Sequence, residues 1–573
     1  MGQRCESLAP LAAACLPAML VALPHDWRFA PLHAAVLALA LALAWRAPLI
    51  DRQLAHRPGF RWLLMGGAAA ALCWLLFGAS PSRTWSIIDD HEIHALIGAG
   101  RDRIPAAAIS GVVTRHPEIA RLTFTSTRYR PAYYLLRIGE AAAWGRWSDG
   151  WMITRLVLFT FTGLLGFDLL RQWLGFVGGG IALAAFAGLW MWPEIVIQTG
   201  PPECYAAPAV VAFAWCAVHI LRSGAAAGGA LWAGLTLAAL VAIGSKENFV
   251  VLAPLALLVA FCEWRRGRLT AAAVAACVVV TTAAIWVAFV VGMGITANGG
   301  RDVYQRPVGL AGFARGGEGS SSRAFRKIAG YGLPLIAVAG GLLVAAWRSR
   351  LAQPRQAAMF AVGATVALTA LSQFFFYRGE VFKKCRYDLP FVPLVVILLI
   401  GGLVVLSAWR SGGAFVRRVR RRLLVPGALA LAACGLGGDH ARTVTRGYAA
   451  RTQAFCARLD ALASACRAAP ERPVVFEIEA DPAANYEPTL SVPTYLRSFG
   501  ITNALFLDPA GIPLPANPAA ATWQERDLAM AARDGGYHFS PWQRLLPKPP
   551  PIDVRITTPD IDGGHPPTTF HFP

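Results

Sequence analysis

The sequence predicts an α-helical polytopic membrane protein, with about thirteen transmembrane helices and a small α/β C-terminal domain on the outer face. Three observations support this fold class. Of the 573 residues, 56% are hydrophobic and only 15% are charged, which is more apolar sequence than a soluble domain of this length needs. The apolar residues form runs of the length that a bilayer requires. After residue 438 these runs stop and the composition becomes mixed.

The predicted spans divide the chain into three parts. An N-terminal transmembrane hairpin (1–60) precedes the main transmembrane domain (61–438), whose outer-face loop is 80–152, and the C-terminal domain follows (439–573). The first run is kept as a span because no convincing signal-cleavage site follows it. The spans lie near residues 8–23, 30–46, 61–79, 153–170, 176–192, 205–221, 226–243, 247–262, 269–293, 331–347, 357–376, 389–408 and 423–438.

The C-terminal domain has its own predicted elements. An Ala/Arg-rich amphipathic helix covers about 441–468, a strand covers Pro473 to Glu479, and Ser491 to Gly500 is helical. The last twenty-five residues contain runs of proline, which predict irregular structure. The eleven cysteines are scattered without metal-ligand or CxxC spacing and indicate no disulfide framework.

Arginine in the short loops orients the spans. The net charge is +20, but most arginines lie between apolar runs, which indicates membrane topology and argues against nucleic-acid binding. Four arginine clusters fall on one side, the cytoplasm, if the N-terminus is cytoplasmic. They lie at 46–61, 265–268, 348–355 and 410–422.

One doubtful apolar segment, Pro131 to Gly145, decides on which side of the membrane every later loop lies. It is short and carries Arg137 and Glu140, and counting it as a crossing would place every later arginine cluster outside. We therefore predict that it lies at the outer interface, with Tyr133, Tyr134 and Trp144 at the headgroup level. The polar segments then share the outer face. They are 80–152, 198–205, 244–248, 295–330 and 377–388.

An acidic stretch just after the third span is the first candidate site. Asp89, Asp90 and Glu92 stand among His91 and His94, and ionisable groups at membrane depth are candidates for function by default. Asp90, with Asp89 as the second choice, could act as a general base, its pKa tuned by burial and by its neighbours. His91, Glu92 and His94 could complete a divalent metal site. The alternative is that these acids only offset the dipole at a helix start.

Cations between two late spans form the second candidate site. Arg378, Lys383, Lys384 and Arg386 lie in an outer loop, against the usual charge bias, and a phosphate or diphosphate headgroup would explain them. The loop 295–330 is similarly basic, and its glycines and serines at 316–322 suggest a lid. A solvated loop or a contact to anionic lipid is the alternative.

Two further segments place charged side chains at span ends on the same face. Pro201-Pro202 fixes an extended backbone before Glu203, which we predict as a second acid of the site. Lys246 and Glu247 follow the seventh span and are further candidates for substrate binding. Each acid could instead be an ordinary interfacial residue.

The order of these elements resembles the integral-membrane C-type (GT-C) glycosyltransferases, including protein O-mannosyltransferases and lipid A aminoarabinose transferases. The acidic motif follows an early span, Arg130-Pro131-Ala132-Tyr133-Tyr134 is similar to the family's Pro-rich segment, and Arg386-Tyr387-Asp388-Leu389-Pro390 is similar to its Arg-Tyr-x-x-Pro element. The similarity covers roughly residues 60–410. Two departures are Asp-Asp-His-Glu in place of an Asp-Glu pair and one proline where two are usual.

The resemblance implies a GT-C-like catalytic domain at 61–438 that moves a sugar from a polyprenyl-phosphate donor to a lipid, glycan or protein acceptor. The reaction would occur at the outer face of the cytoplasmic membrane. It implies that Asp90 or Asp89 is the base, that the basic residues near 378–386 hold the donor phosphate, and that Arg130, Tyr133 and Tyr387 lie near substrate. A multi-span lipid or glycan flippase is the chief alternative; it predicts charged residues near mid-span and a two-sided pathway. A non-catalytic scaffold would leave the acidic stretch without an explanation.

Overall fold

The computed structural model describes residues 2–22, 30–86, 90–116, 118–119, 128–223, 225–297, 386, 389, 425–436, 438–479, 482–508, 538–539, 552–557 and 569–571. Three predicted spans (331–347, 357–376 and nearly all of 389–408) lie outside the described residues, as does almost all of the basic loop 295–330.

Within the described residues, six helices are long and apolar enough to cross a membrane. They are α2 (Ala30–Ala55), α3 (Pro58–Phe77), α7 (Ser148–Ala187), α9 (Glu203–Arg222), the joined η4 (Glu247–Val251) and α11 (Leu252–Arg265), and α12 (Ala271–Ala297). Two shorter apolar helices coincide with predicted spans, Leu8–Ala22 of α1 (Gly2–Ala22) and α10 (Gly229–Ser245). The protein is a multi-pass helical membrane protein, and the total of thirteen spans stays a prediction.

Helix α7 contains two predicted spans in one continuous assignment. The backbone leaves helical geometry at Gly175, where φ is 73°, a conformation that glycine adopts without steric cost. Past this point the chain folds back. A Cβ built on Gly163 would lie 4.0 Å from Leu183, and one on Gly180 would lie 3.3 Å from Phe167. The two halves are therefore antiparallel, as the predicted pair 153–170 and 176–192 requires.

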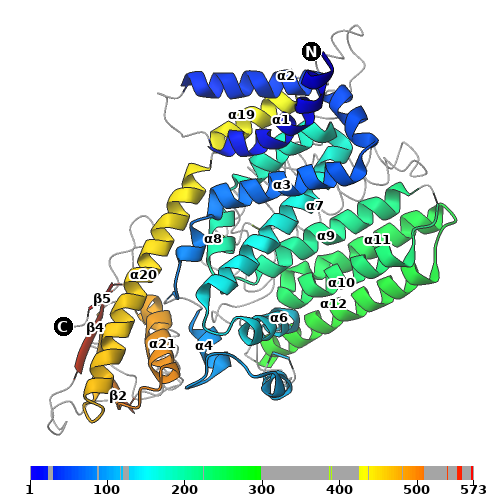
Figure 1. The fold of residues 1–573 in the computed structure, drawn as a ribbon. Helices are drawn as coiled ribbons and strands as arrows, with labels where there is room; N and C mark the ends of the chain where they lie inside the picture. The colour runs from blue at the N-terminus through cyan, green and yellow to red at the C-terminus, as the bar shows by residue number, and fades with distance from the viewer. Residues whose placement is uncertain are drawn as a thin grey trace, which may run out of the picture.

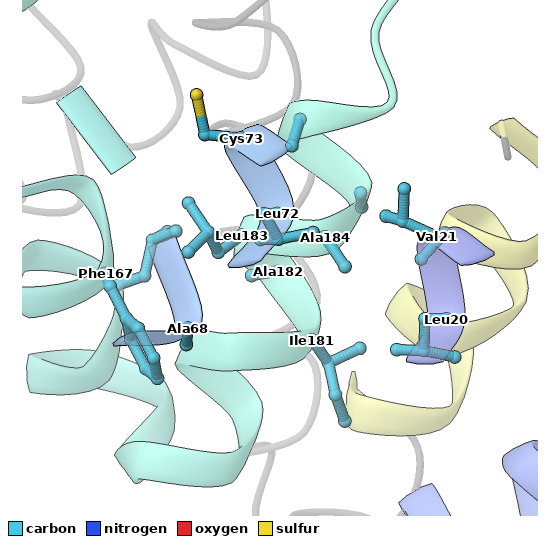
Figure 2. Packing of buried hydrophobic residues seen from close by; sticks show 14 of the residues in the cluster. Leu20, Val21, Ala68, Leu72, Cys73, Phe167, Ile181, Ala182, Leu183 and Ala184 are labelled. Carbon is cyan, nitrogen blue, oxygen red and sulfur yellow. The ribbon is translucent and has the colours of Figure 1, made fainter. Parts of the chain in front are cut away.

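Small residues let the helices pack closely. Figure 2 shows α1, α3 and α7 meeting through Leu20, Leu72 and Ile181 in the first apolar core, which α2 and α19 (Val425–Leu436) complete. A second core joins α9, α10, α11 and α12, which lie side by side in Figure 1. A Cβ on Gly163 would stand 3.2 Å from the Cβ of Ala69. Close approach of this kind is how helices associate in lipid, where apolar burial alone gives no driving force.

The segments predicted to be cytoplasmic meet at one end of the bundle, which we call the inner end. Asp51 accepts a hydrogen bond from the Phe176 amide at 2.8 Å, so the C-terminal end of α2 touches the turn of α7. Arg222 donates to the Gln172 side chain at 2.8 Å, and Arg266 donates to the Leu221 carbonyl at 2.8 Å. Two of the four predicted arginine clusters, 46–61 and 265–268, thus lie at the same end.

Short helices fill the opposite, outer end. They are η2 (Ser80–Ser82), α4 (His91–Ile97), η3 (Ala106–Ala108), α5 (Ile109–Arg115), α6 (Pro131–Ala143) and α8 (Trp192–Ile197). Helix α6 is the doubtful segment 131–145, and at 13 residues it is not among the candidate spans. The depth of this segment in the membrane stays a prediction. Tyr133 itself is covered by protein, and its hydroxyl donates to the Gly200 carbonyl.

The C-terminal elements form a mixed sheet with two helices. Helices α20 (Asp439–Ala468) and α21 (Pro482–Ser498) accompany strands β1 (Val474–Glu479), β2 (Leu505–Asp508), β3 (His538–Phe539), β4 (Ile552–Thr557) and β5 (Thr569–His571). The strand order is β3-β2-β1-β4-β5, and only β5 runs antiparallel to its neighbour. The predicted helix 441–468 and strand 473–479 are found. The prediction that the last twenty-five residues are irregular is wrong at β4 and β5, because β4 pairs with β1 and β5 pairs with β4.

A third apolar core joins the outer loop to these C-terminal elements. It contains Ile93 and Ile97 of α4, Trp151 of α7, and Leu459 and Leu496 of α20 and α21. In Figure 1, α4 lies between α21 and α6. The predicted division into domains at residue 439 stays a prediction, but the packing across it is continuous.

Candidate functional site

The site is organised around a buried loop, 198–202, between α8 and α9. Pro201 and Pro202 cannot donate backbone hydrogen bonds. The prediction of an extended backbone before Glu203 is wrong at Pro202, which has φ −66° and ψ −17° because it begins the first turn of α9. A buried irregular backbone must find side-chain partners for its carbonyls. The Gly200 carbonyl accepts from Tyr133 at 2.7 Å, and the Thr199 carbonyl accepts from Arg137 at 3.0 Å and from Arg155 at 3.5 Å.

Asp90 lies against this loop and is completely buried, with 0% exposure. One carboxylate oxygen accepts hydrogen bonds from the Arg83 guanidinium and, at 2.7 Å, from the Ser86 amide. The other accepts from the Thr199 hydroxyl. Three donors from three different residues therefore meet this one carboxylate. In this arrangement Asp90 holds the acidic segment to the loop.

Glu92 is the accessible acid of the same motif. Its side chain is 39% exposed, and its Oε2 lies 3.7 Å from Nη2 of the fully buried Arg137. Arg137 also donates to the Tyr133 hydroxyl and to the Thr199 carbonyl. One guanidinium therefore links the exposed carboxylate to the buried loop.

The structure adds a charge pair that the sequence did not single out. Arg155 of α7 binds Glu140 of α6 through two parallel hydrogen bonds of 2.9 and 3.0 Å, and Tyr205 donates to the same carboxylate. Paired geometry of this kind is the strong form of an Arg–carboxylate contact. The available signal was the presence of Arg137 and Glu140 in an otherwise apolar run, but nothing local indicated Arg155 as the partner.

Glu203 and Lys246, both predicted for the site, form a buried ion pair. Glu203 begins α9, and Lys246 directly follows the end of the neighbouring helix α10. Within the part of the chain that the structure describes, the buried Oε2 of Glu203 has no hydrogen-bond partner, an arrangement that costs free energy unless another group, a ligand or water meets it.

Arg386 lies on the other side of the same loop. Its amide donates to Glu194 at 2.7 Å, and its guanidinium donates to the Gln198 side chain at 3.0 Å. Gln198 and Thr199 are neighbours in the chain, so the residue that binds Arg386 adjoins the residue that binds Asp90. Asp90 of the predicted acidic site and Arg386, the described cation of the predicted basic site, thus meet at one loop.

Arg130 and Glu247 bind each other at 3.0 Å. Glu118 also approaches and accepts from the Arg130 amide at 3.1 Å. Burial raises the pKa of the Glu118 carboxyl to about 7, although Arg130 opposes the shift. A carboxylic acid with a pKa near neutrality is suited to proton transfer.

The proposed metal ligands do not come together. His91 shares a hydrogen bond of 2.9 Å with Ser491, His94 shares one of 3.0 Å with Ser498, and Glu92 points toward Arg137. Burial lowers the pKa of His94 to about 3, helped by Arg146 and His91, so His94 is neutral. In the described ranges, no three His, Cys, Asp or Glu side chains are grouped as a metal site. We do not carry the metal into the proposed function.

Five predicted site residues lie outside the described residues and stay predictions. They are Asp89, Arg378, Lys383, Lys384 and Tyr387. The others all lie at the outer end. Asp90, Glu92, Glu203 and Arg386 surround the loop 198–202 directly or through one partner, whereas Arg130 and Glu247 form a separate pair beside it.

Comparison with known proteins adds one similarity. No family model matches the chain, and no curated protein matches it. Among solved structures, the chain is similar to the crystal structure of ArnT from Cupriavidus metallidurans bound to undecaprenyl phosphate. The TM-score is 0.40 and the identity 14%, with 87% of this chain and 93% of that chain covered. At this TM-score the similarity assigns neither the fold nor the function.

Proposed function

We propose that the protein is a membrane glycosyltransferase of the C type, which moves a sugar from a polyprenyl-phosphate donor to an acceptor at the outer end of the helix bundle. The observation that carries the proposal is the convergence on one buried loop. Asp90 and Arg386 bind Thr199 and Gln198 of the loop, and Lys246 binds Glu203, which directly follows it; Asp90, Lys246 and Arg386 come from distant parts of the sequence.

The chemistry of sugar transfer needs this combination of charges. When the sugar leaves its phosphate, negative charge grows on the phosphate oxygens, and fixed cations stabilise it. Arg386 is the described cation for that role, because a guanidinium binds phosphate through two oxygens. The acceptor hydroxyl or amine must lose a proton, and a carboxylate near the transferred carbon can take it.

We propose Asp90 as the base and Glu92 as the alternative. Asp90 would have to exchange Arg83 or Thr199 for the acceptor before it could take a proton, since both now donate to it. Glu92 already reaches the surface of the site. Catalytic hydrogen bonds often form only with substrate in place, so burial alone does not remove Asp90.

The flippase alternative predicts charged side chains along a pathway between the two ends. Helices α10 and α12 contain no Asp, Glu, Lys, Arg or His, and in α9 and α11 such residues stand only in the terminal turns. The middle of these four helices therefore offers no charged pathway between the two ends, which favours an enzyme over a transporter. The argument concerns α9 to α12, because α7 buries Arg155 and Asp168 and most of the late spans lie outside the described residues.

The test is release of polyprenyl phosphate by the purified full-length protein in lipid nanodiscs, with a panel of undecaprenyl-phosphate sugars as donors and an outer-membrane lipid extract as acceptor. We expect Asp90→Asn to lose about 10²–10⁴-fold in rate if it is the base, and Glu92→Gln to lose as much if that role belongs to Glu92. Arg386→Ala should weaken binding of undecaprenyl phosphate itself by about 10- to 100-fold, the range of a charge-assisted hydrogen bond.

Two exposed residues of the outer loop serve as matched controls. Asp102→Asn and Arg101→Ala remove the same groups from positions that are exposed to solvent. Both should keep the wild-type rate and affinity. Wild-type activity in Asp90→Asn, Glu92→Gln and Arg386→Ala alike would contradict the proposal, as would an unreactive wild type in the presence of every donor.

A further inference from the structure

The segment 82–86, which precedes the acidic motif, receives hydrogen-bond partners from the C-terminal helices α20 and α21. Residues 83–86 belong to no helix or strand, and they are largely buried. Their backbone groups therefore need partners from elsewhere. The Thr84 amide donates to Thr452 of α20 at 3.2 Å, and Gln453 donates to the Ser82 carbonyl. In addition, the Cys456 thiol contacts the Trp85 carbonyl at 3.5 Å.

Tyr495 of α21 is linked to Asp90 through a single peptide unit on each side of Ser86. The fully buried Tyr495 hydroxyl donates to the Ser86 carbonyl at 2.6 Å. The amide of the same Ser86 donates to the Asp90 carboxylate at 2.7 Å. The Ser86 carbonyl and amide belong to two successive peptide units, so the two hydrogen bonds fix the backbone on both sides of the Ser86 Cα.

Two serines on the same face of α21 hold helix α4. Ser491, Tyr495 and Ser498 follow the spacing of one helical face, and the two serines bind His91 and His94 of α4. The Ser498 hydroxyl donates to the Tyr495 carbonyl at 2.8 Å. Since a hydroxyl has one proton, Ser498 must accept from His94, which places the His94 proton on Nδ1.

We propose that α21 is part of the site, and that Tyr495 is a positioning residue that fixes the Asp90 carboxylate through Ser86. The proposal rests on the proposed function for its catalytic meaning. Its structural content does not, because the anchoring of residues 84–86 can be measured without turnover. Tyr495 touches no substrate in this scheme. Its hydroxyl acts only through the Ser86 backbone, whose carbonyl it holds and whose amide donates to Asp90.

Tyr495→Phe removes the hydroxyl and keeps the buried ring, which packs against His94 with centroids 4.6 Å apart. Thr494→Val is the matched control, because the Thr494 hydroxyl bonds only to the Leu490 carbonyl of its own helix. The measurement is hydrogen exchange of the backbone amides of residues 84–90 in the full-length protein. We expect Tyr495→Phe to speed exchange there by about tenfold, the effect of losing one net hydrogen bond, and Thr494→Val to leave it unchanged.

Kinetic measurements distinguish a role of Tyr495 in positioning Asp90 from a role in the overall stability of the protein. Tyr495→Phe should lower kcat by about 10- to 100-fold, the cost of a small misplacement of a reacting group, with the KM for donor and the melting midpoint near those of Thr494→Val. Unchanged exchange at 84–90 would overturn the anchoring. Faster exchange with a wild-type kcat would overturn the positioning role. If the wild type transfers no sugar, the proposed function fails, while exchange still decides whether α21 anchors the acidic segment.

Discussion

The two ends of the helix bundle both bury ion pairs, but they use them differently. At the inner end the arginine–carboxylate pairs join residues that are near in sequence. Arg171 pairs with Asp168 three residues before it, and Arg266 pairs with Glu263 at the same separation. Contacts between distant segments are also present there, such as Asp51 with the Phe176 amide and Arg222 with the Gln172 side chain. The Arg268 guanidinium donates to the Ser223 carbonyl at the end of α9, which that helix would otherwise leave unsatisfied.

At the outer end the loop 198–202 is bound by residues that are far away in sequence. Thr199 meets Asp90 across 109 residues, and Arg386 meets Gln198 across 188. Each of these contacts brings a charged group to the same loop. The comparison teaches that burial of charge alone does not identify a site, because both ends bury ion pairs. The proposed site rests instead on the convergence of charged groups from distant segments on one loop.

The largest expected effect comes from Arg155 at the outer end. Arg155→Met leaves Glu140 buried without its cation, and breaking a buried pair on one side costs about 3–5 kcal/mol of stability. The double variant Arg155→Met with Glu140→Gln should recover part of this loss. Thermal and chemical unfolding in detergent measure both. If the single and double variants were equally unstable, the pair would not be coupled as the 2.9 and 3.0 Å contacts indicate.

A smaller effect depends on pH and belongs to Glu118. Its pKa of about 7 in the folded protein lies above the ordinary value of 4.5, so the folded state binds more protons between these values. Stability from this group is therefore present below about pH 4.5 and is lost as pH rises to about 7, by up to about 3 kcal/mol at 1.36 kcal/mol per pH unit. Glu118→Gln should flatten the unfolding midpoint over this window. A profile of the same slope in the variant would assign the effect to another group.

The smallest expected effect is at the inner end. Gly175 has a positive φ, and a Cβ there would lie 2.6 Å from Oδ2 of Asp51. Gly175→Ala should cost about 1–2 kcal/mol for the backbone conformation, while donor binding at the outer end stays unchanged. Gly166→Ala, in the same helix with nothing within 4 Å of the added Cβ, is the control. Loss of donor binding in Gly175→Ala would show that the two ends are not independent.

The sequence predicted the features that repeat or that follow charge. Apolar runs located the described spans, and arginine placed the loops at 46–61 and 265–268 together, because both signals are local. Contacts between side chains of different helices could not be predicted from the sequence. Nothing near Arg155 indicates Glu140 as its partner, and nothing in Ser491 or Ser498 indicates α4. The metal hypothesis came from the spacing of His91, Glu92 and His94, but the tertiary contacts of α21 and α6 draw these side chains apart.

The dependence of residues 82–86 on α20 and α21 has a consequence for biosynthesis. Thr84 receives its partner from Thr452, 368 residues later, and Ser86 receives its partner from Tyr495, 409 residues later. At about 5–20 residues per second, the ribosome needs roughly 20–80 s to make this stretch. Throughout that interval residues 82–86 have been synthesised, but Thr452 and Tyr495, which bind them in the folded protein, have not. Assembly of the outer end is thus among the last events of synthesis, and a chain that stops before residue 495 leaves the Ser86 carbonyl without its tyrosine.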